Sequence, residues 1–470
     1  MDNAKKIIKN DTVIQAIKPL LEGYNAYLVG GFVRNALLEE TSPDKDIIIE
    51  SDDVKNLAKS IAEKLDGHFV PLDEINNIYR VILPNKIDYI DLTAPVNGSL
   101  EEDILRRDLT INSIIYNINT QEFIDIAGGI NDIKNKVIKG ILEQNFLDDP
   151  LRLLRIYRFY SKLGFKIDEN LIEITKKYRN LIQKPAKERV NLELSKLFEG
   201  KWAADALEKM YKTGLLEEIL PVAKELEKIP PNSHHHLDLL DHSIEVVRQI
   251  QNNFEKADKE IREYLTNTTL GNTNLLGNLK IAGFLHDIGK PQTWTIEEDT
   301  GRHRFIKHDD IGSKLAPQIL KELKFSKKQI AYISKLIKYH IYPANIVSMP
   351  NVTEKAFTKF YRKMEGIVIE VIILSMSDRL SALGPEITND IVEKNLSGLT
   401  KLLNNYLETK EDMKPLEKLL DGNEIMEILN IKQSETLGKI IKELKEAQVS
   451  GDVLTKEDAI KFIKNTTNLI

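Results

Sequence analysis

The hydrophobic pattern of this chain changes near Asp148, and that change limits the folds open to it. Before it, short apolar runs read as strands at residues 26–31, 45–51, 79–84, 86–93 and 122–127. Segments with helical or mixed spacing separate them, at residues 32–40, 53–65 and 106–118. After it the spacing is almost wholly helical. The pattern predicts an α+β chain in which a strand-containing N-terminal part precedes a helical remainder.

Length and composition exclude several classes of protein. At 470 residues the chain suggests about three domains. Its 42% hydrophobic and 29% charged residues are typical of an ordinary folded protein. Without cysteine it has no disulfides or thiolate metal sites. No apolar run reaches the roughly 18 residues of a membrane helix, and the N-terminus has no signal-peptide pattern. We therefore expect a cytoplasmic protein with no membrane association.

Charge is unevenly distributed along the chain. The net charge of −6 by itself argues against a nucleic-acid binder. Residues 152–189, however, hold 11 Lys and Arg against 4 Asp and Glu. Such a basic zone can follow a phosphate backbone, but it can equally be a solvated helix face, and charge alone favours the second interpretation.

Two aspartates open the second apolar run. On a strand Asp44 and Asp46 would point to the same face, where two carboxylates can hold a hard divalent cation whose shell a substrate's phosphates complete. Asp91, in a separate run, could add a third carboxylate. Upstream, Gly30 and Gly31 allow a tight turn into a helix whose free N–H groups suit a phosphate, and Arg34 lies one turn further on. Each feature alone is more often structural; together they support a phosphate site and a pair of turns about equally.

The ordered motifs are more specific than any one of them. The chain contains, in order, "GGFVRNALL…DKD", "SLEEDILRRDLTIN", "IDIAGGINDI", "DDPLRLLRIYRF" and "KERVNLEL", followed by the tail sequence "LLDGNEIMEILNI". This series resembles the bacterial-type (class II) tRNA nucleotidyltransferases and their poly(A) polymerase relatives, of the polymerase β superfamily, over nearly the whole chain. There are departures: Asn35 stands where Asp usually follows the arginine, Leu109 where Phe is usual, and Asp148 where Glu is more frequent.

The resemblance implies a role for each matching position. Asp44 and Asp46 would bind Mg²⁺, and Asp91 stands less securely where a further catalytic acid is expected. The implied nucleotide-binding residues are Gly30, Gly31 and Arg34 for the triphosphate, Arg107, Asp108 and Asn112 for ribose and phosphates, Asp149 and Arg152 for the base, and Arg155 for a phosphate contact.

Asp149 and Arg152 lie at i and i+3 and so share a helix face. A carboxylate only accepts hydrogen bonds and a guanidinium only donates them. Cytosine and adenine both present an amino donor beside a ring-nitrogen acceptor, whereas uracil and guanine present the reverse order. The pair can therefore accept C and A without a template. Locally, the alternative is a plain helix start, with Asp149 as N-cap and Pro150 as the first helical residue.

The implied reaction is in-line transfer of C and A from CTP and ATP to the 3′ end of tRNA, with release of pyrophosphate. In this family two metals serve the 3′-hydroxyl and the triphosphate. The basic zone directly after Asp149 is then suited to holding the tRNA acceptor stem through its phosphates and shape.

A second constellation lies in the helical half. His242, His286, Asp287, His308, His340 and Asp378 occur in this order, all in segments that read as helical or helix-terminal. Histidine and carboxylate suit transition metals, although a lone histidine on an apolar helix is more often a core residue. The set resembles the "H…HD…D" signature of HD phosphohydrolases, with His308 and His340 matching the extra ligands of dinuclear members. The resemblance implies a phosphatase or phosphodiesterase that uses a divalent transition metal or Mg²⁺. His234–His236 read as loop residues.

With the resemblance, the chain divides into a mixed-sheet nucleotidyltransferase head (1–145), an all-helical neck that reads the base and binds RNA (146–228), an HD domain (229–400) and a helical tail (401–470). Three alternatives stay open: a poly(A) polymerase or an enzyme that adds only CC or only A, an HD phosphohydrolase whose N-terminal half merely binds RNA, and an RNA-binding scaffold. The sequence does not fix the oligomeric state.

Overall fold

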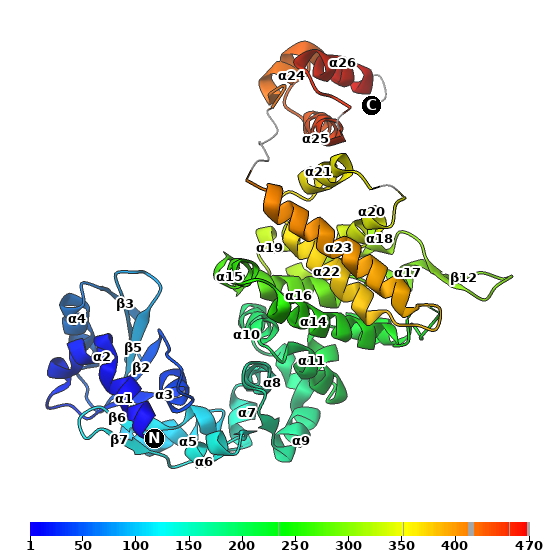
Figure 1. Ribbon diagram of the computed structural model, residues 1–470. Helices are drawn as coiled ribbons and strands as arrows, with labels where there is room; N and C mark the ends of the chain where they lie inside the picture. The colour runs from blue at the N-terminus through cyan, green and yellow to red at the C-terminus, as the bar shows by residue number, and fades with distance from the viewer. Residues whose placement is uncertain (234, 351, 412–417, 451, 468–470) are drawn as a thin grey trace. The chain divides into compact units, whose positions relative to one another are not determined.

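A computed structural model describes residues 1–233, 235–350, 352–411, 418–450 and 452–467. The chain forms two compact units, Met1–Pro221 and Val222–Ile470 (Figure 1). His234 lies outside the described residues, so its predicted place in a loop has no structural counterpart here.

The first unit contains a mixed seven-stranded sheet in the order β3-β4-β5-β2-β1-β6-β7. Its strands are β1 (Ala26–Val29), β2 (Lys45–Ile49), β3 (His68–Asp73), β4 (Ile78–Ile82), β5 (Tyr89–Thr93), β6 (Ile115–Asn117) and β7 (Glu122–Ile124). The strands predicted in all five apolar runs are thereby confirmed. Neighbours pair antiparallel except β2 and β5, which are parallel.

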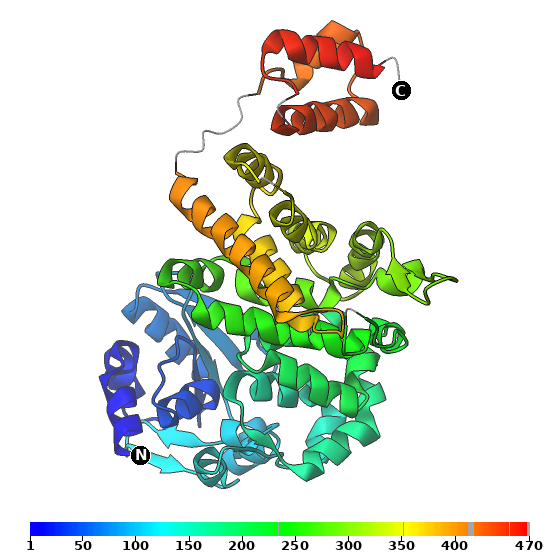
Figure 2. The ribbon, with the colours of Figure 1, turned by 45° about the vertical axis from the view of Figure 1, so that its right-hand side comes forward.

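Both faces of the central strands are buried, which is why β2 reads as a continuous Ile47-Ile48-Ile49 run. Helix α3 (Gly30–Leu37) packs on β1 and β2, and α4 (Val54–Lys64) packs on β3, β4 and β5. Figure 2 shows the sheet and its helices from a second side. The apolar cluster that includes Val29, Ile48 and Ile115 anchors the strand ends from which the functional side chains project.

The rest of the first unit is mainly helical. The short helix α7 (Gln144–Asp148) leads into α8 (Leu151–Leu163), which packs against α10 (Lys187–Glu199) and α11 (Ala203–Lys212). This part also contains α9 (Glu169–Tyr178) and α12 (Leu215–Ile219), and the second unit begins with α13 (Val222–Glu227).

The second unit is built around α16 (Leu275–Leu285), all of whose residues are buried. Around it pack α14 (Leu239–Lys256), α15 (Lys259–Asn267), α19 (Lys327–Tyr339) and α22 (Val368–Ser381). Helix α18 (His308–Glu322) packs on α19, and α23 (Asn389–Thr409) packs on α22. A separate small core joins α24 (Gly422–Leu429), α25 (Glu435–Ser450) and α26 (Lys456–Thr467).

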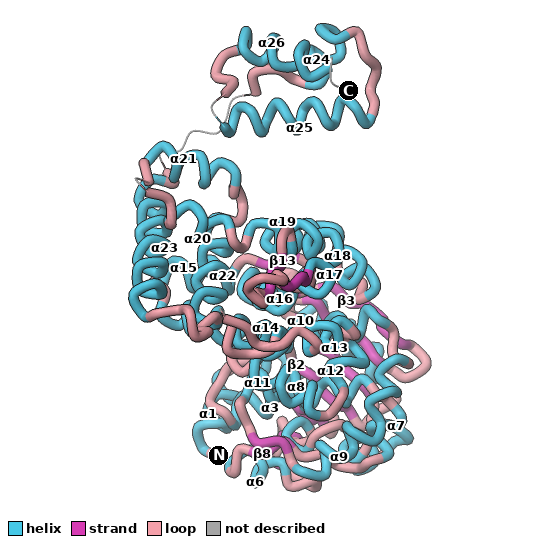
Figure 3. Tube along the Cα trace, turned by 90° about the vertical axis from the view of Figure 1, so that its right-hand side faces the viewer, coloured by secondary structure: helices cyan, strands magenta, loops and turns pink. Residues whose placement is uncertain are grey.

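The α+β class predicted from the sequence is confirmed, but the helical remainder is not free of strands. Figure 3 shows short strand segments among the helices beyond the head. They are β9 (Lys166–Ile167), which pairs with β8 (Val137–Ile138) of the head, β10 (Thr269–Leu270) with β11 (Thr273–Asn274), and the hairpin β12 (Trp294–Ile296) with β13 (His303–Phe305). Two- and three-residue strands leave too short a pattern for periodicity to reveal.

Candidate functional site

The head and neck residues expected to act on a nucleotide converge on one cavity of about 750 Å³ inside the first unit. Asp44, Asp46 and the glycine turn line one part of it, and residues of α8 and α10 line another. Of the set named from the sequence, the lining includes Gly30, Gly31, Arg34, Asp44, Asp46, Arg107, Asp108, Asn112, Asp149, Arg152 and Arg155. Asp91 does not line it.

Asp46 and Asp91 lie at the same level of the sheet. The parallel register pairs Asp46 of β2 with Asp91 of β5. Arg80 holds Asp91 in a bidentate ion pair, with nitrogen–oxygen distances of 2.7 and 2.8 Å. Burial, and then the charge of Asp91, raise the pKa of Asp46 to about 6. A buried carboxylate so close to another one needs a cation to be stable in its charged form.

The glycine turn keeps the space beside Asp46 open. Gly30 has φ +70°, and a Cβ there would lie 2.7 Å from Asp46 Oδ2. Helix α3 begins at this residue without a side-chain cap, as an anion-binding helix start requires. Arg107, which Asp103 holds at 3.1 Å, adds a positive charge that acts on Asp46.

Arg34 is buried and oriented by two neutral amides. Its Nη1 donates to Asn112 Oδ1 at 2.6 Å, and its Nε and Nη2 both donate to Asn35 Oδ1, at 3.2 and 2.8 Å. Burial and the charge of Arg158 lower the pKa of Arg34 to about 10, which leaves it protonated at neutral pH. Because Asn35 carries no charge, it fixes the guanidinium without neutralising it.

A chain of one hydrogen bond and two ion pairs runs from Asn112 to α8 and α10. Asn112 donates to Asp108 Oδ1 at 3.2 Å, and Arg155 Nε donates to Asp108 Oδ2 at 2.7 Å. Arg155 also pairs with Glu193 at 3.3 Å. Burial alone would raise the pKa of Asp108, but Arg155 and the hydrogen bonds to this carboxylate lower it to about 2. Asp108 is therefore ionised and joins the segment that contains Asn112 to α8.

The two residues expected to read the base are held separately. Arg152 Nη1 donates to the backbone carbonyls of Arg106 and Asn145, at 2.7 and 3.0 Å. Asp149 Oδ2 accepts from Arg189 at 2.8 Å. Asp149 has extended backbone angles and Pro150 has helical ones, and Asp149 Oδ1 accepts a weak 3.4 Å bond from Leu151 N. The helix-start geometry predicted locally is therefore present within one residue, while the other carboxylate oxygen of Asp149 pairs with Arg189.

Sequence reasoning missed several residues of this cavity. Phe159 packs under three guanidinium groups, whose centres lie 4.9, 5.4 and 3.7 Å from its ring for Arg34, Arg155 and Arg158. Further lining residues are Lys162, Arg189, Glu193 and Lys196. The spacing of Arg152, Arg155, Arg158 and Lys162 at three or four residues was the available signal, since it places them on one helix face.

The six His and Asp residues of the second constellation also come together, within the second unit. Three overlapping groups have ligand atoms within 4.8 Å of one another: His242, His286 and Asp287; Asp287, His308 and His340; His286, His340 and Asp378. Asp287 lies at the centre. Its Oδ2 is 3.1 Å from His286 Nε2, and its Oδ1 is 3.2 Å from His308 Nε2. Asp378 Oδ1 is 3.2 Å from His242 Nε2.

All four imidazoles turn the same nitrogen inward. Each Nδ1 contacts a backbone carbonyl, at 3.3 Å for His242, 2.8 Å for His286 and His308, and 2.7 Å for His340. The Nε2 atoms therefore face one another, at 3.3 Å for His242 with His286 and for His308 with His340. This arrangement fixes the tautomer that presents Nε2 to a metal. The donor set fits one or two divalent ions, with Asp287 able to bridge them.

Two neighbours of this cluster escaped the sequence interpretation. His235 is indeed a loop residue, but its ring centroid lies 4.5 Å from that of His242 and its Nε2 contacts Lys290 Nζ at 3.3 Å. Lys290 in turn pairs with Asp287 at 2.6 Å. Gly289 allows the close approach, since a Cβ there would lie 2.1 Å from the carbonyl oxygen of His308. Lys290 follows Asp287 by three residues, a spacing that was readable in "HDIGK".

Among the helices that the structure describes, none combines the length and the hydrophobicity that a membrane span needs.

Three family profiles match the chain: "Poly A polymerase head domain" at residues 26–139, "Probable RNA and SrmB-binding site of polymerase A" at 164–227, and "HD domain" at 239–383.

Curated relatives match over most or part of their length. A CC-adding tRNA nucleotidyltransferase of Thermus thermophilus is 28% identical over 95% of this chain and 94% of its own. An A-adding enzyme of Deinococcus radiodurans is 29% identical over 93% and 95%. A CCA-adding enzyme of Bacillus subtilis is 34% identical, but over 44% of this chain and 54% of its own.

Among solved structures, a CCA-adding enzyme in complex with CTP matches with a TM-score of 0.57 at 18% identity, over 99% of this chain and 98% of its own. A Thermotoga maritima CCA-adding enzyme complexed with tRNA matches with the same score, identity and coverage. These likenesses support the fold.

Proposed function

We propose that this chain adds C and A from CTP and ATP to the 3′ end of tRNA without a template. It belongs to the bacterial-type tRNA nucleotidyltransferase and poly(A) polymerase family and is a nucleotidyltransferase with an HD domain. The observation that carries the proposal is the single cavity in which a carboxylate pair lies with buried Arg34 and a set of partly buried arginines. Acid on one side and positive charge on the other suit a metal–triphosphate.

We assign the metal-binding role in the head to Asp44 and Asp46, with Asp91 setting the charge of Asp46 from the neighbouring strand. Bound there, Mg²⁺ would supply the charge that activates the 3′-hydroxyl and stabilises the leaving pyrophosphate. Gly30 leaves the space beside Asp46 free, and Arg34 with the first N–H groups of α3 holds the phosphates. The protein's share of the reaction is positioning, because the groups that surround the transferred phosphate are fixed before the substrate arrives.

Asp108 and Asn112 hold the ribose end of the nucleotide, and Arg155 supports them. Arg155 already carries ion pairs to Asp108 and Glu193, so in our proposal its main role is to hold Asp108 in place. Arg107 adds a positive charge that acts on the Asp46 carboxylate.

Base selection falls to Asp149 and Arg152. A carboxylate has about four lone-pair sites, so Asp149 can keep Arg189 and still accept from the amino group of cytosine or adenine. Arg152 donates to the adjacent ring nitrogen. Arg189 then acts as the residue that holds Asp149 in place.

The test is incorporation of single nucleotides into three tRNA transcripts, ending before the CCA sequence, after its first C and after its second C. Full CCA addition predicts CTP incorporation into the first two and ATP incorporation into the third. Asp46→Asn should lower the rate by at least about a hundred-fold, while Asp52→Asn, an exposed carboxylate outside the cavity, serves as the matched control. Full activity of Asp46→Asn would contradict the assignment.

A CC-specialised enzyme is the second candidate, because relatives that match over more than nine-tenths of this chain include CC-adding enzymes. CTP incorporation without ATP incorporation would select it. Long A-tails on RNA other than tRNA would select a poly(A) polymerase instead.

For the HD domain we propose a metal-dependent phosphohydrolase that acts on phosphate esters at RNA 3′ ends. The four imidazoles and two carboxylates hold divalent ions, and Lys290, positioned by His235, offers a cation for the substrate's phosphate. Hydrolysis of bis(p-nitrophenyl) phosphate and of a 2′,3′-cyclic nucleotide with Mn²⁺, Ni²⁺ or Mg²⁺ tests this. We expect the Asp287→Asn variant to lose hydrolysis and to keep nucleotide incorporation. Equal hydrolysis by the wild type and by Asp287→Asn would overturn the proposal.

A further inference from the structure

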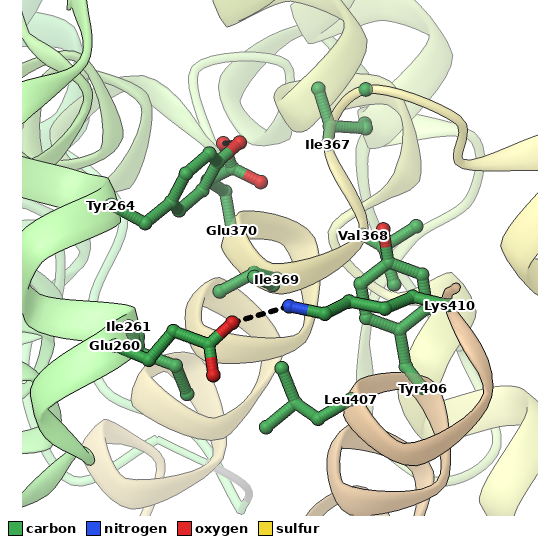
Figure 4. A pocket seen from close by; sticks show the side chains of 11 residues that line it. Glu260, Ile261, Tyr264, Ile367, Val368, Ile369, Glu370, Tyr406, Leu407 and Lys410 are labelled. Atoms are coloured by element: carbon green, nitrogen blue, oxygen red, sulfur yellow. Dashed lines mark hydrogen bonds and ion pairs between the residues drawn. The ribbon is translucent and has the colours of Figure 1, made fainter.

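A second buried acid lies in the HD half, apart from the metal cluster. A cavity of about 250 Å³ opens between α15, the start of α22 and the end of α23 (Figure 4). None of the six clustered His and Asp residues lines it. The nucleotide-transfer and phosphohydrolase functions therefore leave this cavity without a role.

Glu370 of α22 provides the polar end of the cavity. It is 1% exposed. Its Oε1 accepts from two tyrosine hydroxyls, Tyr264 at 3.0 Å and Tyr332 at 2.9 Å. Its Oε2 is buried and has no side-chain hydrogen-bond partner among the described residues. Burial raises the pKa of Glu370, while its own backbone N–H and the charge of Lys335 lower it. A buried carboxylate oxygen without a hydrogen bond costs more free energy than a buried neutral acceptor without one. Native proteins contain few buried polar atoms of either kind that lack a partner.

The remaining walls are aromatic and aliphatic. Figure 4 shows Tyr264 and Tyr406 on two sides of the space, with one oxygen of Glu370 beside Tyr264 and the other pointing between the two rings. Further apolar lining comes from Ile261, Ile367, Val368, Ile369 and Leu407. At the rim Glu260 pairs with Lys410, so the only charge on the cavity that no described side chain pairs is the acid of Glu370.

This chemistry selects the class of ligand. A divalent metal requires about six oxygen ligands, which one carboxylate and two tyrosines already engaged as donors do not supply. An anion is excluded by Glu370. A cation with an apolar stem satisfies both the open Oε2 and the aliphatic walls, and the tyrosine rings add cation–π attraction. The volume equals that of roughly eight water molecules at about 30 Å³ each, enough for a short alkyl chain.

We propose that this cavity is a binding site for a small organic cation, a primary alkylammonium whose charged end contacts Glu370 Oε2 and whose chain lies against Ile261, Val368 and Leu407.

Isothermal titration calorimetry on the full-length protein with n-butylammonium, putrescine and neutral n-butanol tests the site. We expect the ammonium compounds to bind one per chain and n-butanol not to bind. Glu370→Gln, which keeps an acceptor for the tyrosines and removes the charge, should weaken binding by more than about ten-fold. Leu407→Trp should block the cavity without changing its acid.

One further variant and one control measurement separate binding in the cavity from binding to exposed acids nearby. Glu263→Gln, on the exposed face of α15, should bind like the wild type. Thermal unfolding of Glu370→Gln checks that the variant is folded. The proposal is overturned if no saturable one-to-one binding is found, if folded Glu370→Gln and Leu407→Trp both bind as well as the wild type, or if Glu263→Gln weakens binding as much as Glu370→Gln does.

Discussion

Replacing Gly30 by alanine should disable nucleotide transfer while leaving the head folded. The new Cβ would lie 2.7 Å from Asp46 Oδ2, whereas ordinary contacts begin at 3.4 Å, so the carboxylate has to retreat by about 0.7 Å (3.4 − 2.7). Metal–oxygen distances tolerate only about 0.2 Å, and a misplacement of about 1 Å can cost roughly a hundred-fold in rate. The positive φ adds a strain of about 1–2 kcal/mol to folding.

The matched control separates strain from contact. Gly98 has φ +72°, and nothing lies within 4 Å of a Cβ built there. Gly98→Ala should therefore show the same loss of unfolding free energy and normal catalysis. The assay is CTP incorporation into a tRNA transcript at increasing Mg²⁺, with urea denaturation of each variant. If Gly30→Ala incorporates CTP within about three-fold of Gly98→Ala, the argument that this glycine protects the Asp46 carboxylate fails.

Three other predictions follow from the sites. Because the pKa of Asp46 is raised to about 6, the carboxylate gains its proton as pH falls below 6, and at subsaturating Mg²⁺ the incorporation rate should drop about ten-fold per pH unit there; a rate that is flat from pH 7 to 5 would contradict this. Arg189→Ala should lower kcat/KM for CTP about ten-fold with an unchanged melting temperature, since its pair with Asp149 is largely exposed and such pairs contribute only about 0–1 kcal/mol; normal kinetics would show that Asp149 needs no holder. His340→Ala should reduce the metal content measured by plasma mass spectrometry from about two ions per chain to about one, and a parallel loss of CTP incorporation would argue against separate sites.

Local sequence was sufficient for the central strands and for the carboxylate pair. The isoleucine run of β2 and the alternation in β5 are strong strand signals, and Asp44 and Asp46 share a face by strand geometry alone. Local sequence did not predict β3, because this edge strand contains Pro71 and buries little surface. Residues 106–118 also misled, because a buried turn at Thr110–Asn112 and the short strand β6 were read as one helical or mixed segment.

Contacts distant in sequence account for the rest. The bond from Arg34 to Asn112 spans 78 residues, and the pair of Arg155 with Asp108 spans 47. No periodicity reports such contacts. The bonds from Arg34 to Asn35 join adjacent residues, but the sequence pattern does not show that the two side chains turn toward each other. For the same reason His235 could be assigned to a loop but not to the edge of the metal cluster, which only the tertiary structure brings beside it.

The parallel pairing of β2 with β5 limits where insertions and deletions can be accepted during the evolution of this protein. Asp46 and Asp91 stay level only while neither strand gains or loses a residue, since a slip of one position turns every side chain to the opposite face. The residues between the two strands form α4 and the β3–β4 hairpin, which contribute nothing to the lining of the nucleotide cavity. Because Arg80 of β4 also holds Asp91, insertions and deletions should accumulate in α4 and in the β3–β4 turn and be absent from β2, β4 and β5.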